Sequence, residues 1–386
     1  MILRLFSPKN DFTENTGETH VGRLSAEERS ALQEAVTRLL TDHGGEAEVR
    51  CAMDTPRGYD PELWGRLSAM GVPGLLVDPA YGGAGAGPME LEAVMEAAGA
   101  ALLCSPLLAS GVMAAELLWA LGDGDAQARL LPGIAAGSTL ATAALTGDAG
   151  DWSADGVTVR VEDDRLTGVA SFVLHGQNAD VLLVLARGGD GVAVYEVDPK
   201  TTGVGITALP TFDHTLRLAR ITFDGAAGRR LSGEAWPAAE AAIRMALVGL
   251  AGEQAGGARR CLEFTVEYAR GRYQFGRAIG SFQAIKHMAA DLLLETESAI
   301  SAARSAAAKL ADQAPDAEAA LHLAAFACAD AFTRVAQDSI QMHGGIAFTW
   351  EHPSHLYLRR ARADAVLFGG PAEHRERFLA AIGGRR

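Results

Sequence analysis

The strongest constraint on the fold of this sequence is a β-rich segment enclosed between two long helical regions. Between about Leu140 and Leu231, short runs rich in valine and leucine are separated by glycines and aspartates. Examples are Val157–Val161, Val181–Leu185 and Val192–Tyr195. Such runs, spaced roughly 8–12 residues apart, are typical of a small β-sandwich or barrel. The order helical, β, helical predicts an α+β chain.

The region before this segment has the pattern of helices joined by loops. Ser25 followed by Glu28 has the spacing of a capping box, and apolar residues then recur at steps of three to four. A second helix is expected over Pro61–Met70, ending at Gly71, and a third over Met89–Leu103. Helices and loops therefore dominate the first third of the chain.

The region after Trp236 is alanine-rich and predicts three long helices. They are expected over Ala238–Arg272, from Phe282 to about Asp312, and from Asp316 to about His343. These lengths exceed the globular average of about 10–14 residues and suit an antiparallel bundle. The predicted domains are an N-terminal extension (1–23), a helical domain (24–136), a β-domain (137–232) and a C-terminal bundle (233–386).

Charge and cysteine usage exclude several classes of protein. The 34 Lys and Arg against 48 Asp and Glu give a formal net charge of -14, which repels nucleic acid. The four cysteines form no CxxC pair, as expected in a reducing compartment. The N-terminus lacks a signal-peptide core, and no apolar run reaches the ~18 residues of a membrane span. We therefore expect a soluble, cytoplasmic protein without nucleic-acid or membrane partners.

Two short motifs resemble ligand sites but are interpreted as structural. The glycines at 82–87 lack the Lys-Ser/Thr ending of a P-loop, so a connecting loop is expected. His352 and His355 have no ExxH or Cys partner that would complete a metal site, and no metal is expected. GxSxG and HExxH motifs are also absent from the sequence.

Two other stretches admit a ligand. In Tyr268–Gly276 a helix ends at an arginine pair and a glycine, and Phe282-Gln283 restarts the helical pattern. The arginines there either complement the helix dipole or bind a pyrophosphate. In Gln341–Glu351 a helix stops at paired glycines. These glycines either end the helix or let the backbone approach a ligand closely.

Taken together and in this order, the R-x-x-FG, FQ and Q-x-x-GG signals resemble the acyl-CoA dehydrogenase family, from about Leu24 to Ala381. The resemblance implies an N-terminal helical domain, a central β-barrel or sandwich domain and a C-terminal four-helix bundle. It also implies FAD as the cofactor, an acyl-CoA substrate, electron transfer to an electron-transfer flavoprotein, and dimers or tetramers.

The resemblance also implies roles for individual residues. Arg272 would bind the FAD pyrophosphate of a neighbouring subunit, and Phe275 and Gln283 would line the same cofactor. Further contacts to FAD would come from Gln341, Gly344 and Gly345 across the interface, and from Thr146 and Leu174 at the flavin. Family members often carry Trp and Thr where Phe172 and Leu174 stand, so one hydroxyl contact to the flavin is missing.

The residue that the family uses as a base is also missing. The family removes a weakly acidic proton next to a thioester, which requires a placed carboxylate. The two positions that carry this glutamate among relatives correspond to Gly369 and Ala246, and neither residue can take a proton. Glu253, two turns further along the same predicted helix, is a candidate for a displaced base.

Three explanations remain open. Glu253 acts as the base, or a partner subunit supplies the glutamate, or the chemistry has changed. The stretch TWEHPSHLYLRRA from Thr349 to Ala361 is similar to paired actinobacterial dehydrogenase subunits of steroid side-chain breakdown, which favours the partner. A flavin monooxygenase of the same fold would need no such base, and a structural subunit would need no flavin.

Small residues between Ala246 and Gly257 are compatible with a bulky acyl group, because they leave room between helices. They are equally compatible with close helix packing.

Overall fold

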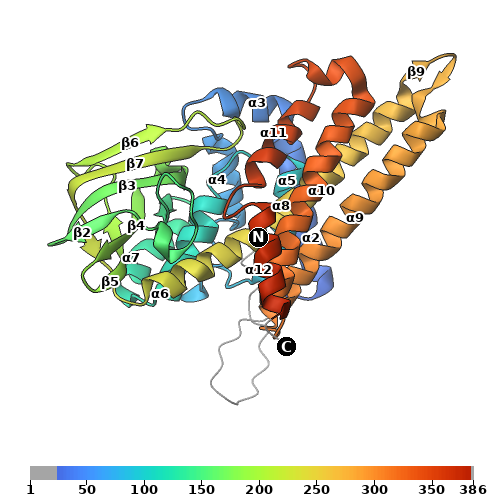
Figure 1. The fold of residues 1–386 in the computed structure, drawn as a ribbon. Helices are drawn as coiled ribbons and strands as arrows, with labels where there is room; N and C mark the ends of the chain where they lie inside the picture. The colour runs from blue at the N-terminus through green and yellow to red at the C-terminus, as the bar shows by residue number, and fades with distance from the viewer. Residues whose placement is uncertain (1–23, 384–386) are drawn as a thin grey trace.

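The computed structural model describes residues 24–383, and the predicted extension at 1–23 lies outside this range. The chain has the predicted order: helices, then a sheet, then a helical bundle. In Figure 1 the sheet lies at the left, the N-terminal helices lie in the middle, and the long C-terminal helices extend to the upper right. The three parts therefore pack side by side, with the N-terminal helices between the other two.

The N-terminal helices begin where the sequence predicts. The Ser25 amide donates to Glu28 Oε2 at 3.0 Å and the Glu28 amide donates to Ser25 Oγ at 3.2 Å, which confirms the capping box. The predicted helix over Pro61–Met70 is also confirmed, and Gly71 ends it with φ of 94°. The helices are α2 (Ala26–His43), α3 (Glu46–Asp54), α4 (Pro61–Met70), α5 (Pro88–Ala100), the π-helical η2 (Leu108–Ala114), α6 (Ala115–Leu121) and α7 (Gly124–Ala135).

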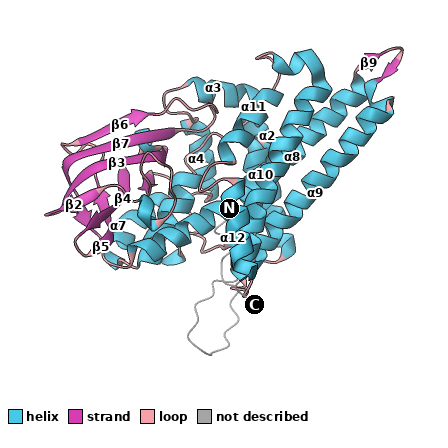
Figure 2. Ribbon diagram, in the orientation of Figure 1, coloured by secondary structure: helices cyan, strands magenta, loops and turns pink. Residues whose placement is uncertain are grey.

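The β-rich segment forms a single curled sheet (Figure 2). Its strands are β1 (Ala141–Ala144), β2 (Arg160–Glu162), β3 (Arg165–Leu174), β4 (Val181–Gly188), β5 (Gly191–Val197), β6 (Val204–Ala208), β7 (Leu218–Ala227) and β8 (Arg229–Arg230). The strand order is β6-β7-β3-β2-β4-β5-β8, and β1 joins it in parallel with β4. The alternating run at 157–161 is only partly a strand, because the 3₁₀ turn Ala154–Gly156 delays the start of β2 to Arg160.

The C-terminal bundle is built on three long helices. They are α8 (Ala235–Gly271), α9 (Gln283–Ala311) and α10 (Ala317–His343). The short hairpin of β9 (Tyr273–Gln274) and β10 (Arg277–Ala278) connects α8 with α9, and α11 (Ser354–Asp364) and α12 (Pro371–Gly383) follow α10. Within residues 24–383 the helical stretch Ala317–Phe348 has the length and composition of a membrane span, but 61% of its most apolar window is buried. Its packing against α8, α9 and α12 accounts for this apolar composition.

Glycines set the distance between α5 and α8. A Cβ atom on Gly256 would overlap the carbonyl oxygen of Glu96, and a Cβ on Gly99 would overlap that of Glu253. A Cβ on Gly252 would lie 2.6 Å from the carbonyl oxygen of Glu92. These small residues therefore bring two helix backbones into contact, and they do not leave room for a bulky group.

This contact predicts opposite effects for two glycine substitutions. Gly256→Ala should lower the free energy of unfolding by about 1–3 kcal/mol, because the added methyl group must separate α5 from α8. Gly65→Ala, in the exposed interior of α4, has no atom within 4 Å of its Cβ and should raise that free energy by up to about 1 kcal/mol. Urea denaturation of the two variants measures both changes. Equal effects would contradict the close packing.

Candidate functional site

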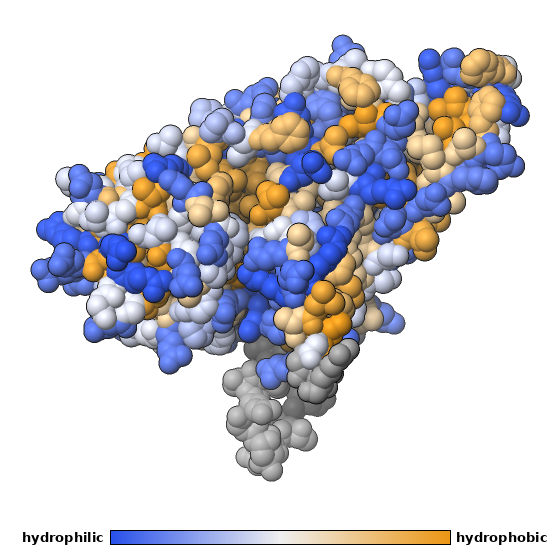
Figure 3. Space-filling view, in the orientation of Figure 1, coloured by the Kyte–Doolittle hydropathy of each residue, from blue (hydrophilic) through white to orange (hydrophobic). Residues whose placement is uncertain are grey.

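The arginine-glycine motif lies at the tip of the bundle, where α8 turns into α9. Arg272 ends α8, and its amide donates to the Tyr268 carbonyl oxygen at 2.8 Å. Phe275 is 92% exposed and has a left-handed backbone with φ of 51°, followed by Gly276 with φ of 76°. Figure 3 shows apolar side chains at this tip, at the upper right of the molecule. Arg272 and Phe275 are therefore both exposed at this tip.

The second motif lies at the same end of the bundle. Tyr268 of α8 stacks on His343 of α10, with ring centroids 4.4 Å apart, and its hydroxyl donates to the His343 carbonyl oxygen at 3.3 Å. Directly after His343, Gly344 adopts φ of 68° and ψ of -144°, a conformation suited only to glycine. Neither Gly344 nor Gly345 would meet an atom within 4 Å of an added Cβ. The backbone there is open to a ligand.

Two further predicted residues extend this surface. Gln283 is the first residue of α9 and is exposed, and Gln341 is exposed in the last turn of α10. Phe282, which precedes α9, makes no side-chain cap bond, so the backbone amides of the first turn of α9 have no cap from that residue. Six of the predicted cofactor residues (Arg272, Phe275, Gln283, Gln341, Gly344 and Gly345) therefore belong to one exposed end of the bundle, called here the grip.

The remaining two predicted cofactor residues lie in the β-domain, far from the grip (Figure 1). Thr146 pairs with Ser171 in an isolated β-bridge and donates its hydroxyl to the Asp151 carbonyl oxygen at 2.6 Å. Leu174 ends β3, and its carbonyl oxygen accepts from the Thr142 hydroxyl at 2.6 Å. Both residues are buried. One chain therefore does not bring all eight predicted cofactor residues together.

Two aromatic side chains cover this edge of the β-domain. Trp152 follows the loop after Thr146 and packs edge-on against Phe368, with ring centroids 5.0 Å apart. Trp152 is nearly buried and Phe368 is fully buried. This contact links the β-domain to the segment after α11, next to the first predicted base position.

The two positions predicted to correspond to the family's base differ in their surroundings. Gly369 has φ of 112°, which side-chain-bearing residues rarely adopt, and an added Cβ would lie 2.9 Å from Glu373 Oε2. Ala246 is completely buried within α8.

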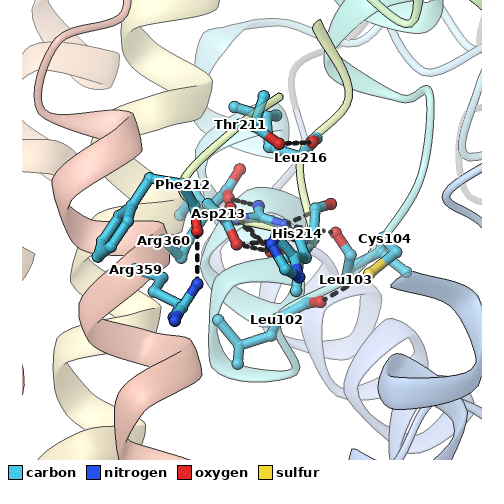
Figure 4. Close-up of polar contacts among 12 residues, drawn as sticks. Leu102, Leu103, Cys104, Thr211, Phe212, Asp213, His214, Leu216, Arg359 and Arg360 are labelled. Atoms are coloured by element: carbon cyan, nitrogen blue, oxygen red, sulfur yellow. Dashed lines mark hydrogen bonds and ion pairs between the residues drawn. The ribbon is translucent and has the colours of Figure 1, made fainter. Parts of the chain in front are cut away.

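Glu253 is paired with a buried arginine. Its carboxylate bonds Arg360 Nη1, and Arg360 Nε donates to Asp213 Oδ2 at 2.9 Å and to Thr215 Oγ1 at 3.0 Å. Arg360 Nη2 lies 3.3 Å from the Leu103 carbonyl oxygen and 3.2 Å from that of Thr215. Figure 4 shows Arg360 reaching from α11 toward Asp213. One guanidinium thus joins α8, α11, the loop between β6 and β7, and the N-terminal helices.

Burial shifts the pKa values of two titratable groups next to this cluster in the direction that favours their neutral forms. Burial, reinforced by Glu253, raises the pKa of Asp364 well above its usual value, although Arg360 acts in the opposite direction. Burial, followed by the charges of Arg217 and Arg360, lowers the pKa of His175 to about 3. Both groups line a cavity of about 30 Å³ with Glu253 and Leu174. This volume holds about one solvent molecule and excludes an acyl chain.

Arg360, Asp213 and Asp364 were not predicted from the sequence. A signal was present in the helical spacing, because Leu356, Tyr357, Arg360 and Asp364 fall on one face of α11, and all are buried. An arginine and an aspartate four residues apart on an apolar face indicate a buried polar network. Asp213, which forms the ion pair with Arg360, lies 147 residues earlier in a loop, and no local sequence pattern identifies it.

Removing the charge of Arg360 should destabilise the protein strongly. Arg360→Met leaves Glu253 and Asp213 buried without their cation, which typically costs about 3–5 kcal/mol. Arg362→Met, an exposed arginine on the same helix, should change stability by no more than about 0.5 kcal/mol. Thermal and urea unfolding of both variants provide the comparison. A small effect of Arg360→Met would mean that the cluster contributes little.

Models of two domains match the sequence. The model of the acyl-CoA dehydrogenase N-terminal domain matches residues 26–138, and that of the C-terminal domain matches residues 233–382. Among curated proteins, the acyl-CoA dehydrogenase IpdE2 of Mycobacterium tuberculosis is 38% identical over 90% of this chain and 95% of its own length. IpdE2 of Mycolicibacterium smegmatis is 34% identical over 92% of this chain and 99% of its own length.

Solved structures of two complexes have the same fold. A steroid ACAD variant of Tcur3481-Tcur3483 matches with a TM-score of 0.84 and 30% identity, over 93% of this chain and 98% of the matched chain. The ChsE4-ChsE5 complex from Mycobacterium tuberculosis matches with a TM-score of 0.85 and 29% identity, over the same shares.

Proposed function

The chain belongs to the acyl-CoA dehydrogenase family, and we propose that it takes part in FAD-dependent α,β-dehydrogenation of an acyl-CoA thioester as the subunit that lacks the base. In this proposal a glutamate-bearing partner supplies the base. One observation supports this proposal most directly. Within one chain, the exposed grip lies far from Thr146 and Leu174, the buried residues of the β-domain that are predicted to contact the flavin and are called here the flavin edge. The relation to the ChsE4-ChsE5 and Tcur3481-Tcur3483 complexes supports an assembly of two different chains.

The residues of the grip suit a dinucleotide. Arg272 offers a cation and paired donors for a pyrophosphate, Phe275 offers an exposed ring, and the first turn of α9 offers backbone amides. The open backbone at Gly344 and Gly345 admits close approach. Because the grip lies far from the β-domain of its own chain, we infer that it holds FAD bound to a neighbouring subunit.

The flavin edge of this chain does not suit a flavin in the same way. Thr146 and Leu174 are buried, and the cavity that Leu174 lines has a volume of only about 30 Å³. With Gly369 and Ala246 at the usual base positions, this half of the site has neither room nor a base. These features favour a contribution through the grip alone.

The chemistry divides between the two chains accordingly. FAD, when bound, supplies the acceptor for the hydride that leaves the carbon next to the deprotonated one. The partner's carboxylate would take the proton, while Arg272 and the α9 amides of this chain would neutralise and orient the pyrophosphate. Glu253 remains a candidate base in a second proposal, but its ion pair with Arg360 holds it in the domain junction.

Flavin content tests the role of the grip. Arg272→Ala should abolish the FAD absorbance of the complex formed with a glutamate-bearing relative, because the pyrophosphate loses its cation. Arg270→Ala, an exposed arginine one half-turn earlier in α8, is the matched control and should retain the flavin. The measurement is the visible spectrum of each co-purified complex. Full FAD content in the Arg272 variant would contradict the assignment.

Flavin content and flavin reduction, measured on the lone chain and on the complex, distinguish the alternative functions. We expect it to be colourless, and we expect anaerobic acyl-CoA to bleach flavin only in the complex. Bleaching by the lone chain would favour Glu253 as the base. Oxygen insertion driven by NADH-reduced flavin would identify a monooxygenase, and a colourless complex would identify a structural subunit.

Restoring a glutamate should not restore activity. In Gly369→Glu the new side chain meets Glu373 and forces an L-residue to φ near 112°, which strains the turn. We expect the lone variant to have a lower melting temperature than Gly370→Glu, whose Cβ would meet no atom within 4 Å. Bleaching by the Gly369 variant would mean that only the missing carboxylate inactivates this chain.

We also propose an electron-transfer flavoprotein as the electron acceptor and a soluble, cytoplasmic location. The electron acceptor follows from the family resemblance, and the location follows from the widely spaced cysteines, which are typical of a reducing compartment. The packing of α10 in the centre of the bundle supports a soluble chain.

A further inference from the structure

Three buried polar side chains from three helices line one small cavity beside Gly369. They are Gln254 of α8, Asp364 of α11 and His374 of α12, each no more than 2% exposed, and the cavity has a volume of about 10 Å³. Gln254 Oε1, Asp364 Oδ2 and His374 Nε2 have no hydrogen-bond partner within residues 24–383. Buried polar atoms in native proteins nearly always have one. A polar cavity of this size, with several partners, suits one water molecule.

The protonation states of the lining groups match such a water. Burial and the nearby Glu253 raise the pKa of Asp364, which favours the protonated carboxyl, and a protonated carboxyl can donate. Gln254 Oε1 accepts only. A water can therefore accept from Asp364 while donating to Gln254 and to a ring nitrogen of His374.

A second pair of contacts connects His374 with the surface. His374 Nδ1 lies 3.2 Å from His322 Nδ1, and His322 Nε2 lies 3.9 Å from Glu318 Oε2. His322 on α10 is 12% exposed, and the half-exposed Glu318 also pairs with Arg244. The carbonyl group of Gly369 also faces the His374 imidazole. A chain of polar groups thus runs from the cavity to solvent.

Both histidines are neutral at pH 7. Burial is the main cause that lowers each pKa to about 4, and Arg377 acts on both rings in the same direction. A neutral imidazole has one donor nitrogen and one acceptor nitrogen. Each ring can therefore take up a proton on one side as it releases another on the opposite side.

We propose that an ordered water occupies this cavity and that Asp364, the water, His374 and His322 form a proton path between the protein interior and solvent at Glu318. The path requires neither flavin nor thioester, so it stands apart from the proposed function. It uses groups next to Gly369, where the usual base is missing.

The transfer balances at each step. The O–H bond of Asp364 breaks as the water gains that proton, and the water passes one of its own protons to His374 Nε2. His374 then releases its Nδ1 proton to His322 Nδ1, and His322 releases its Nε2 proton to the Glu318 carboxylate or to bulk water. One proton leaves, Asp364 becomes a carboxylate, and both imidazoles end as the other neutral tautomer.

Infrared spectroscopy of the purified full-length chain tests this path. The carboxylic C=O band of Asp364, identified by its loss in Asp364→Asn, should shift rapidly after transfer to D₂O. His322→Phe and His374→Phe should each slow that shift by about tenfold or more, because exchange then requires local opening. His287→Phe, an exposed histidine on α9, is the control and should leave the rate unchanged. Wild-type exchange rates in both path variants would overturn the proposal.

A crystal structure of the wild-type protein gives a second test that needs no variant. We expect a density peak for one water within hydrogen-bond distance of Gln254 Oε1 and Asp364 Oδ2. A direct bond between these two side chains, or no density between them, would overturn the water site. Either outcome is independent of flavin content, so it leaves the proposed function to its own experiments.

Discussion

The arrangement of the domains depends on one buried cation. Arg360 of α11 binds carboxylates from α8 and from the loop between β6 and β7, and it also reaches a carbonyl group of the N-terminal helical region. A buried charge must be matched by partners at fixed positions. The guanidinium therefore fixes how bundle, sheet and N-terminal helices meet, in addition to any stability that it contributes. The glycines of α5 and α8 set the distance between these two helices at the same junction.

This junction also explains the division of the site. The Trp152–Phe368 contact and the small cavity at Glu253 lie where the three parts meet, so they are packed closely. The grip lies at the far end of the bundle, where Arg272 and Phe275 are largely exposed to solvent. The domain junction is closely packed, whereas the grip exposes groups that can bind a ligand. This arrangement is consistent with a chain that completes a site on another molecule.

Much of this fold was readable from local sequence patterns. The capping box at Ser25, the glycine that ends α4 and the three long helices follow from short-range rules, and the structure confirms them. The start of β2 did not follow, because a 3₁₀ turn takes up the first residues of an alternating run. The grip residues were also identified from motifs, although their roles are proposals. Asp213 was missed because its importance arises from a long-range ion pair that no local pattern records.

Helix α8 joins the two ends of this design as a single element of 37 residues. At 1.5 Å per residue it is roughly 55 Å long, and one end lies beside the sheet while the other carries the hairpin. A rod of this length acts as a lever, so a tilt of about 5° at the sheet would displace the hairpin by about 5 Å. Substitutions beside the sheet can therefore displace the hairpin, and with it the proposed contact with a neighbouring subunit, from a distance.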